Sequence, residues 1–213
     1  MAKPVIYGPA YSTYARTVRL ALEEKGVDYD LVEVDLLQGA NRSPEHLARQ
    51  PFGKVPAFEH DGFALYETDA IARYVDEAFP GTALTPADVR SRARMNQAMS
   101  IIGGYASPSM IGQIFIQRAI MPMVGHAADE AAIAAALPQA EASLKALEQL
   151  IGGNRYLAGD QLSLADLLLA PVYDYLAQTP EGEKLLQAAP KLRRWWDEMR
   201  ERPTVARTRP ALG

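Results

Sequence analysis

The 213-residue chain contains no cysteine. This excludes disulfides, zinc–thiolate sites and any thiol nucleophile supplied by the protein itself. Histidine is also scarce: the three in the chain, His46, His60 and His126, lie far apart and match no metal-binding spacing. We therefore expect no metal cofactor, and we expect all three histidines to lie on the surface.

Strong net charge and long apolar runs are lacking as well. The formal net charge is −4, which argues against nucleic acid as a partner. No apolar run approaches the ~20 residues of a membrane-spanning helix, and the N-terminus lacks the apolar core of a signal peptide. Neither a phosphate-binding glycine loop nor a nucleophile elbow occurs. The sequence predicts a cytoplasmic protein that binds neither nucleic acid nor membrane.

The first 80 residues alternate between strand and helix patterns. They predict, in order, a strand, a helix, a strand, an irregular helix, two strands and a helix, over residues 3–7, 13–25, 29–34, from 43 onward, 55–58, 63–66 and 68–79. His60-Asp61-Gly62 fits a hairpin turn between the last two strands. This layout is that of a thioredoxin-like α/β unit.

The remainder of the chain is predicted to be helical. Residues 81–88 have the composition of a linker, and 89–213 form the second domain. Apolar residues in steps of four and three predict a packed helix over 133–151, and a further helix over 190–202 is expected to stop at Pro203. Ser163 and Asp166 have the spacing of a reciprocal helix cap.

One pair of segments carries the most functional information. In Gln50-Pro51-Phe52-Gly53-Lys54-Val55-Pro56, the final proline holds Val55 extended, so its N–H and C=O can pair with an extended ligand. The helix that begins at Glu67-Thr68 offers unpaired N–H groups and a positive dipole end to a carboxylate. Together they fit a small peptide with an extended backbone and a charged end.

These segments also carry a family resemblance, together with Ser43-Pro44-Glu45-His46-Leu47, Tyr156-Leu157-Ala158-Gly159-Asp160 and Ser163-Leu164-Ala165-Asp166. In this order the chain resembles a cytosolic glutathione S-transferase over nearly its whole length, nearest to the serine-type phi class. The resemblance implies a thioredoxin-like N-terminal domain over 1–80 and an all-α C-terminal domain over 89–213. It also implies a homodimer with glutathione as co-substrate, which detoxifies hydrophobic electrophiles by conjugation.

The resemblance places Ser12 at the position of the catalytic serine. The reaction needs the glutathione thiolate, because the neutral thiol is a poor nucleophile. Ser12 precedes the first predicted helix, so it is also suited to cap that helix, and the two roles are compatible. Tyr7 and Tyr11 are competing hydroxyls, although the place of Tyr7 in an alternating strand favours core packing.

The same resemblance assigns the γ-glutamyl half of the glutathione site. A cis peptide bond at Pro56 would aim the Val55 backbone at the cysteinyl part of glutathione. Glu67 would face the γ-glutamyl ammonium, and Thr68 with the nearby helix N–H groups would hold the adjacent carboxylate. A plain helix-capping role for Thr68 remains the alternative.

The glycyl carboxylate of glutathione is expected to meet Asn41, Arg42 and Lys54, where the phi class places polar and basic residues. Asn41 departs from the histidine expected at its position. For Arg42 and Lys54 an ordinary solvated surface remains the alternative.

The electrophile pocket is expected to be apolar, with core packing as the alternative for each member. Gly103-Gly104 and Pro108 should loosen or kink the helix that supplies most of it. The proposed lining residues are Tyr11, Tyr105, Met110, Ile111 and Phe115.

Other functions on the same fold remain open at this stage. Glutathione-dependent isomerases, dehalogenases and peroxidases use the same thiolate, and non-catalytic transferase-like binding modules also exist. The thiol–disulfide branch of the family is disfavoured because it uses a protein cysteine. The joint presence of Ser12, Glu67 and Thr68 favours an enzyme over a binding module.

Overall fold

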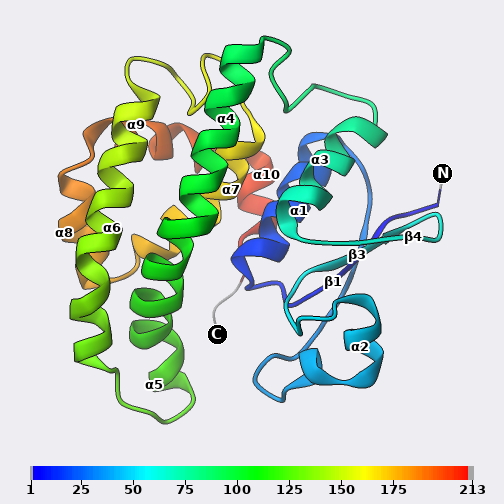
Figure 1. The fold of residues 1–213 in the computed structure, drawn as a ribbon, viewed down its shortest axis with the longest axis horizontal. Coiled ribbons are helices and arrows are strands. Elements are labelled where there is room, and N and C mark those ends of the chain that lie inside the picture. Colours follow the sequence, from blue (N-terminus) through cyan, green and yellow to red (C-terminus); the bar gives the residue numbers. More distant parts are fainter. Residues whose placement is uncertain (1, 211–213) are drawn as a thin grey trace. The chain divides into compact units, whose positions relative to one another are not determined.

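The computed structural model describes residues 2–210 of the chain (Figure 1). It divides into two compact units. One comprises the described parts of Met1–Thr85 and Glu201–Gly213, and the other is Pro86–Arg200. Between 2 and 210, no helix is long and apolar enough to cross a membrane, and no acidic or histidine cluster has the makings of a metal site.

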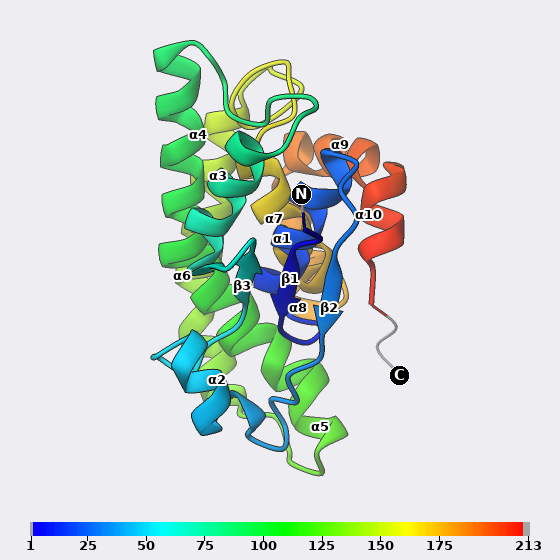
Figure 2. The same cartoon turned by 90° about the vertical axis from the view of Figure 1, so that its right-hand side faces the viewer.

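The first unit is built on a four-stranded mixed sheet in the order β2-β1-β3-β4. The strands are β1 (Val5–Tyr7), β2 (Asp30–Val32), β3 (Ala57–His60) and β4 (Phe63–Tyr66). β1 pairs parallel with β2 and antiparallel with β3, and Figure 2 shows β2 beside β1. Asp61 and Gly62 both have positive φ, 50° and 75°, as a two-residue hairpin turn requires, so the predicted hairpin is confirmed.

Helices of this unit begin where the sequence predicts. α1 (Thr13–Glu24) and α2 (Pro44–Arg49) follow the expected caps Ser12 and Ser43, and a 3₁₀ turn (Ala40–Arg42) precedes α2. α3 (Thr68–Ala78) follows Glu67, which makes no side-chain capping bond, so Thr68 is the first residue of the helix and not its cap. The Ser43 hydroxyl accepts the N–H of His46 at 3.2 Å, with Pro44 in the first turn. Val18 and Ile71 are fully buried, so α1 and α3 contribute to the core with their apolar faces.

The C-terminal segment belongs to this first unit, whereas the sequence-based division assigned all of 89–213 to the second domain. α10 (Pro203–Thr208) lies along α1. Arg202 and Arg207 pair with Glu24 and Glu23 of α1, at 2.6 and 2.8 Å. Pro203 opens this short helix in its first turn, a position in which the missing proline N–H costs nothing.

Residues 80–88 contain no helix or strand, and their first part is tied to the first unit. Lys25 and Asp76 form a buried ion pair at 3.1 Å between the ends of α1 and α3. Lys25 Nζ also donates to the carbonyl oxygen of Thr82, and Asp76 accepts the N–H of Leu84 at 2.8 Å. One buried pair therefore fixes the start of this connecting segment.

The second unit is helical. Its elements are α4 (Val89–Ile101), a π-helix (Ile102–Ile120), α5 (Met121–Met123), α6 (Glu130–Ile151), α7 (Leu164–Leu176), α8 (Pro180–Gln187) and α9 (Pro190–Met199). The π-helix coincides with the segment expected to be irregular and contains Pro108. Along α6, the predicted seam is buried apart from the partly exposed Leu137.

Asp166 organises the interior of the helical unit. It forms the predicted capping box with Ser163, and its Oδ1 also accepts the Leu157 N–H and the Trp195 Nε1–H, each at 2.9 Å. Trp195 is fully buried and Trp196 is 8% exposed, so both neighbouring tryptophans lie in the interior.

The predicted surface location of the histidines is wrong for two of them. His60 is buried against Phe79, with ring centroids 4.7 Å apart, and its Nδ1 lies 2.8 Å from the Tyr74 hydroxyl. His46 is also buried, and its Nε2–H donates to the Lys54 carbonyl oxygen at 2.7 Å. Only His126 is exposed.

Candidate active site

A close approach at Gly8 brings two predicted parts of the site together. A Cβ at Gly8 would lie 3.3 Å from the Ala15 Cβ and 3.4 Å from the Val55 Cβ. The missing side chain lets the turn after β1 pass close to the Val55-Pro56 segment and the first turn of α1. The turn that carries Ser12 is therefore held next to Val55.

Ser12 occupies the N-cap of α1 with an extended backbone, φ −65° and ψ 125°. Its Oγ accepts the N–H of Ala15 at 3.3 Å, a long capping bond. Within residues 2–210 no acceptor takes the Ser12 hydroxyl hydrogen, and the side chain is partly exposed. Capping uses the oxygen as an acceptor, so the O–H is still available as a donor.

Val55 and Pro56 are joined by a cis peptide bond, as the resemblance implied. Pro56 is buried directly before β3, while Val55 is partly exposed. Neither the N–H nor the C=O of Val55 has a backbone partner in the described chain. Both groups are therefore available to an extended ligand.

Three polar side chains brace the loop that leads to Val55. The buried Gln50 Oε1 accepts the N–H groups of Phe52 at 2.7 Å and Lys54 at 3.2 Å. His46 binds the Lys54 carbonyl oxygen, as described above, and Asn41 Nδ2 donates to the Gly53 carbonyl oxygen at 2.7 Å. Sequence reasoning missed the roles of Gln50 and His46, although both lie in segments that carry the resemblance.

Among the three residues expected at the glycyl carboxylate, the side chain of Asn41 has a structural role in this loop, whereas those of Arg42 and Lys54 do not. The side-chain amide of Asn41 is committed to Gly53. Gly53 has a φ of 61°, and a Cβ there would lie 3.3 Å from the backbone carbonyl oxygen of Asn41, so the position favours glycine. Arg42 and Lys54 are exposed, and neither forms an ion pair with a described residue. Of the three residues, Arg42 and Lys54 therefore have side chains free to meet a carboxylate.

Glu67 has an unusual backbone: φ is 71° and ψ is 116°. Such a conformation is costly for a residue with a Cβ, and strain of this kind occurs mainly at functional sites. The Glu67 carboxylate is exposed and makes no capping bond. Thr68 is 8% exposed at the start of α3, where the first backbone N–H groups have no helical partner.

A second carboxylate, Asp69, lies in the first turn of α3. Burial raises the pKa of Asp69; nearby Arg73 opposes the rise and Glu67 adds to it. The N-terminus of α3 thus combines free N–H groups with two acidic side chains.

Of the two rival hydroxyls, that of Tyr7 is engaged elsewhere. The Tyr7 hydroxyl donates to Glu59 Oε2 at 3.3 Å, and the Arg49 guanidinium lies 4.3 Å from the Tyr7 ring centroid. Tyr7 is only partly buried, so its predicted core packing is wrong; its neighbour Ile6 occupies the core. Burial raises the pKa of Tyr11, as do Asp35 and Glu33, so its hydroxyl stays protonated and Tyr11 remains a rival donor.

Four candidates for the electrophile pocket lie in the π-helix of the helical unit. Met110 and Phe115 are 1% and 3% exposed, and Phe115 stacks on Tyr175 with centroids 4.3 Å apart. The structure thus gives these two a core role. Tyr105 is 55% exposed and Ile111 is partly exposed, so both remain accessible.

Comparison with known proteins places both units in one family. Residues 5–77 match the model "Glutathione S-transferase, N-terminal domain", and residues 105–203 match "Glutathione S-transferase, C-terminal domain". Glutathione S-transferase F12 of Arabidopsis thaliana is 32% identical over 205 residues, covering 93% of this chain and 94% of that protein.

Solved structures give the same result. Glutathione transferase F2 from Populus trichocarpa has a TM-score of 0.87 and 32% identity, covering 96% of both chains. Glutathione S-transferase-I, solved with bound lactoylglutathione, has a TM-score of 0.87 and 32% identity, covering 100% of both chains.

Proposed function

The chain belongs to the glutathione S-transferase family, with plant phi-class relatives, and from this premise we propose that Ser12 stabilises the thiolate of bound glutathione. The protein is a glutathione-conjugating enzyme. The observation that carries the proposal is the free O–H of Ser12, on a turn that Gly8 holds beside Val55.

One hydroxyl is enough for this chemistry. An unperturbed thiol has a pKa of ~8.5, so only a few per cent is ionised at neutral pH. A hydrogen bond to a charged group contributes about 1.5–3 kcal/mol, and ~1.4 kcal/mol moves a pKa by one unit. Donation from Ser12 therefore lowers the pKa of the bound thiol by roughly one to two units, to near neutral pH, and the α1 dipole adds a smaller favourable term.

Glutathione is held by backbone and side-chain groups of the first unit. Val55 pairs with the cysteinyl segment through its free N–H and C=O. Glu67 accepts the γ-glutamyl ammonium, and Thr68 with the α3 N–H groups binds the neighbouring carboxylate. Arg42 and Lys54 attract the glycyl carboxylate, while Asn41 keeps the loop in shape.

The thiolate sulfur attacks an electrophilic carbon of a hydrophobic substrate. A C–S bond forms and, with an aryl halide, the carbon–halogen bond breaks and halide leaves. Within the helical unit, Tyr105 and Ile111 supply the accessible side chains proposed to contact the substrate, and Met110 and Phe115 support them from the core. Conjugation of this kind serves detoxification.

We further propose that the enzyme is a cytoplasmic homodimer, with the first unit of each copy against the helical unit of the other. Cytoplasm holds the reduced glutathione that the reaction consumes. An exposed aromatic pair on the first unit supports an interface: Phe52 is 69% and Tyr66 39% exposed, with ring centroids 6.0 Å apart.

Retention on immobilised glutathione, followed by a conjugation assay with an aryl halide, tests the proposed function. We expect retention, elution by free glutathione, and product formation that needs both glutathione and protein. Retention without turnover on a panel of electrophiles would point to a binding module instead.

A further inference from the structure

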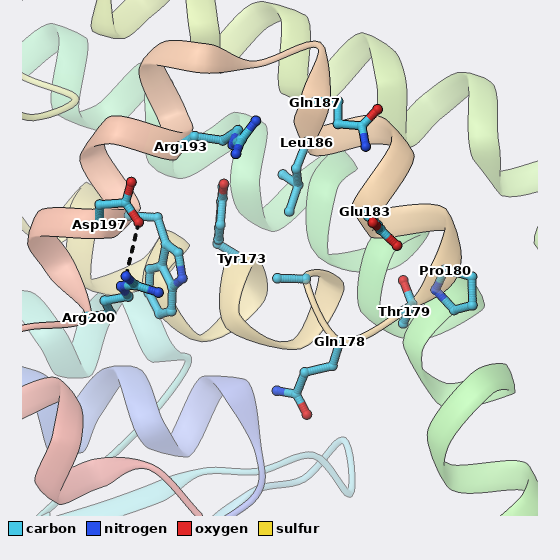
Figure 3. A pocket seen from close by; sticks show the side chains of 12 residues that line it. Tyr173, Gln178, Thr179, Pro180, Glu183, Leu186, Gln187, Arg193, Asp197 and Arg200 are labelled. Carbon is cyan, nitrogen blue, oxygen red and sulfur yellow. Dashed lines mark ion pairs between the residues drawn. The ribbon is translucent and has the colours of Figure 1, made fainter.

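A cavity of about 630 Å³ opens within the helical unit, between the end of α7, α8 and α9 (Figure 3). Its walls include Tyr173, Glu183, Arg193 and Trp196. All its lining residues belong to Pro86–Arg200, whereas the residues proposed to hold glutathione belong to the other unit. None of the lining residues is therefore among those proposed to hold glutathione.

The Tyr173 hydroxyl is a donor without a partner. Tyr173 is only 3% exposed, and its Oη makes no hydrogen bond to any residue between 2 and 210. Figure 3 shows the hydroxyl pointing into the cavity, toward the region of Arg193 and Asp197. Burial raises the pKa of Tyr173, with Arg193 opposing the rise and Asp197 and Glu148 adding to it, so the phenol stays protonated.

The cavity lining carries two positive and two negative side chains. Arg200 and Asp197 pair with each other at 3.5 Å. Arg193 and Glu183 are exposed at the rim, and across the described chain neither has an ion-pair partner. A ligand with one charge would be attracted by one of these two groups and repelled by the other, whereas a ligand with both charges satisfies both.

One wall of the cavity is aromatic. Trp196 is 8% exposed and packs on Tyr173, with ring centroids 5.2 Å apart and a tilt of 31°. An aromatic surface beside polar groups is the usual composition of a small-molecule site.

We propose that this cavity binds a zwitterionic aromatic amino acid. Its carboxylate accepts from the Tyr173 hydroxyl and the Arg193 guanidinium, and its ammonium group meets Glu183. Its ring packs against Trp196. The ligand supplies the acceptor that the Tyr173 hydroxyl lacks among the described residues.

Calorimetry with L-phenylalanine as the probe tests the site. We expect saturable binding of one molecule per chain. 3-Phenylpropionate lacks the ammonium and phenethylamine lacks the carboxylate, so each should bind at least roughly ten-fold more weakly, the scale of one charge-assisted hydrogen bond. Equal affinity for all three compounds, or no binding of phenylalanine at millimolar concentration, would overturn the proposal.

Substitutions then assign the two charged ends. Arg193→Gln should weaken phenylalanine binding roughly ten-fold. Glu183→Gln should also weaken phenylalanine but strengthen 3-phenylpropionate, because it removes a repulsion. Arg194→Gln is the matched control: Arg194 is exposed on the same helix, donates to the Asn154 carbonyl oxygen, and does not line the cavity. An equal loss in Arg194→Gln would contradict the assignment.

Tyr173→Phe separates ligand binding from a structural role. It removes a hydroxyl that faces the cavity and has no partner in the described chain, so the melting temperature should change little while phenylalanine affinity falls. Unchanged affinity would remove the hydroxyl from the site. In the wild-type protein, saturating glutathione should leave phenylalanine binding unchanged, and competition between the two ligands would refute a separate site.

Discussion

Glu67 combines a strained backbone with a side chain that makes no capping bond. A residue without a left-handed preference is kept at φ 71°, and its carboxylate is left exposed at the start of α3. In our account the γ-glutamyl ammonium of glutathione is its partner, so the cost of the strained backbone is offset on binding.

Glu67→Ala should therefore weaken glutathione binding by roughly 2–3 kcal/mol, the loss of a charge-assisted hydrogen bond. Calorimetry measures it directly. Glu67→Gln keeps the size of the side chain and should lose most of the same affinity. Unchanged affinity in both variants would remove Glu67 from the site.

At the scale of elements, the loop between α2 and β3 depends on Gln50. This side chain is 1% exposed and accepts two backbone N–H groups. Gln50→Ala leaves both donors without a partner, so it should destabilise the protein by about 1–3 kcal/mol and weaken glutathione binding. Chemical denaturation and calorimetry check the two effects. Gln38→Ala, at an exposed position, is the control and should change neither.

The buried Lys25–Asp76 pair, which joins the ends of α1 and α3, makes the stability of the protein depend on pH. Burial alone would raise the pKa of Asp76, but the Leu84 N–H, Thr85 and Lys25 together lower it. Because the folded pKa is lower than the unfolded value of ~3.9, the stabilisation is present above about pH 4 and is lost as pH falls through the folded pKa.

Asp76→Asn should consequently lower the free energy of unfolding at pH 7 by about 3–5 kcal/mol, since it leaves the Lys25 charge buried and unpaired. Its stability should also fall less steeply below pH 4 than that of the wild type. Denaturant titrations at several pH values measure both effects, with exposed Glu77→Gln as the control. An unchanged acid slope in Asp76→Asn would refute this account of the pair.

The sequence predicted most helices and strands correctly, because their ends are determined by turn and capping residues that lie next to them in the chain. The hairpin follows from Asp61-Gly62, and the caps at Ser43 and Ser163 follow from residues within three positions. The burial of His46 and His60 depends on tertiary partners, Lys54 and Tyr74, which composition and spacing do not reveal. Ser12 could be predicted because it directly precedes α1, the helix that it caps. The hydrogen bonds between Gln50 and the loop could not be predicted, because they depend on how that loop folds.

At the scale of the whole molecule, the return of α10 to the first unit was beyond sequence reasoning. It rests on Arg202 with Glu24 and Arg207 with Glu23, pairs separated by 178 and 184 residues in the chain. Surface charges of this kind have many possible partners in a sequence, and only the folded chain selects among them.

The proposed homodimer is also a property of the whole molecule. Light scattering at micromolar concentration should give twice the 23.3 kDa mass of the chain. Phe52→Asp should shift the protein toward monomer, because it places a charge on an exposed aromatic residue that we assign to the interface. Leu37→Asp, 60% exposed on the same unit, is the control. A monomeric wild-type protein would contradict the proposal.

The pKa of the bound glutathione thiol tests the central claim, donation from Ser12, most directly. Thiolate absorbance of the complex is titrated against pH in the wild type, Ser12→Ala and Ser12→Thr. We predict that Ser12→Ala raises this pKa by roughly one to two units with little change in glutathione affinity, that turnover recovers at higher pH, and that Ser12→Thr stays near the wild type. If the thiol pKa is unmoved in Ser12→Ala, while stability falls by about 1 kcal/mol, Ser12 only caps α1. A rise in Tyr7→Phe or Tyr11→Phe instead would assign the thiolate to another hydroxyl.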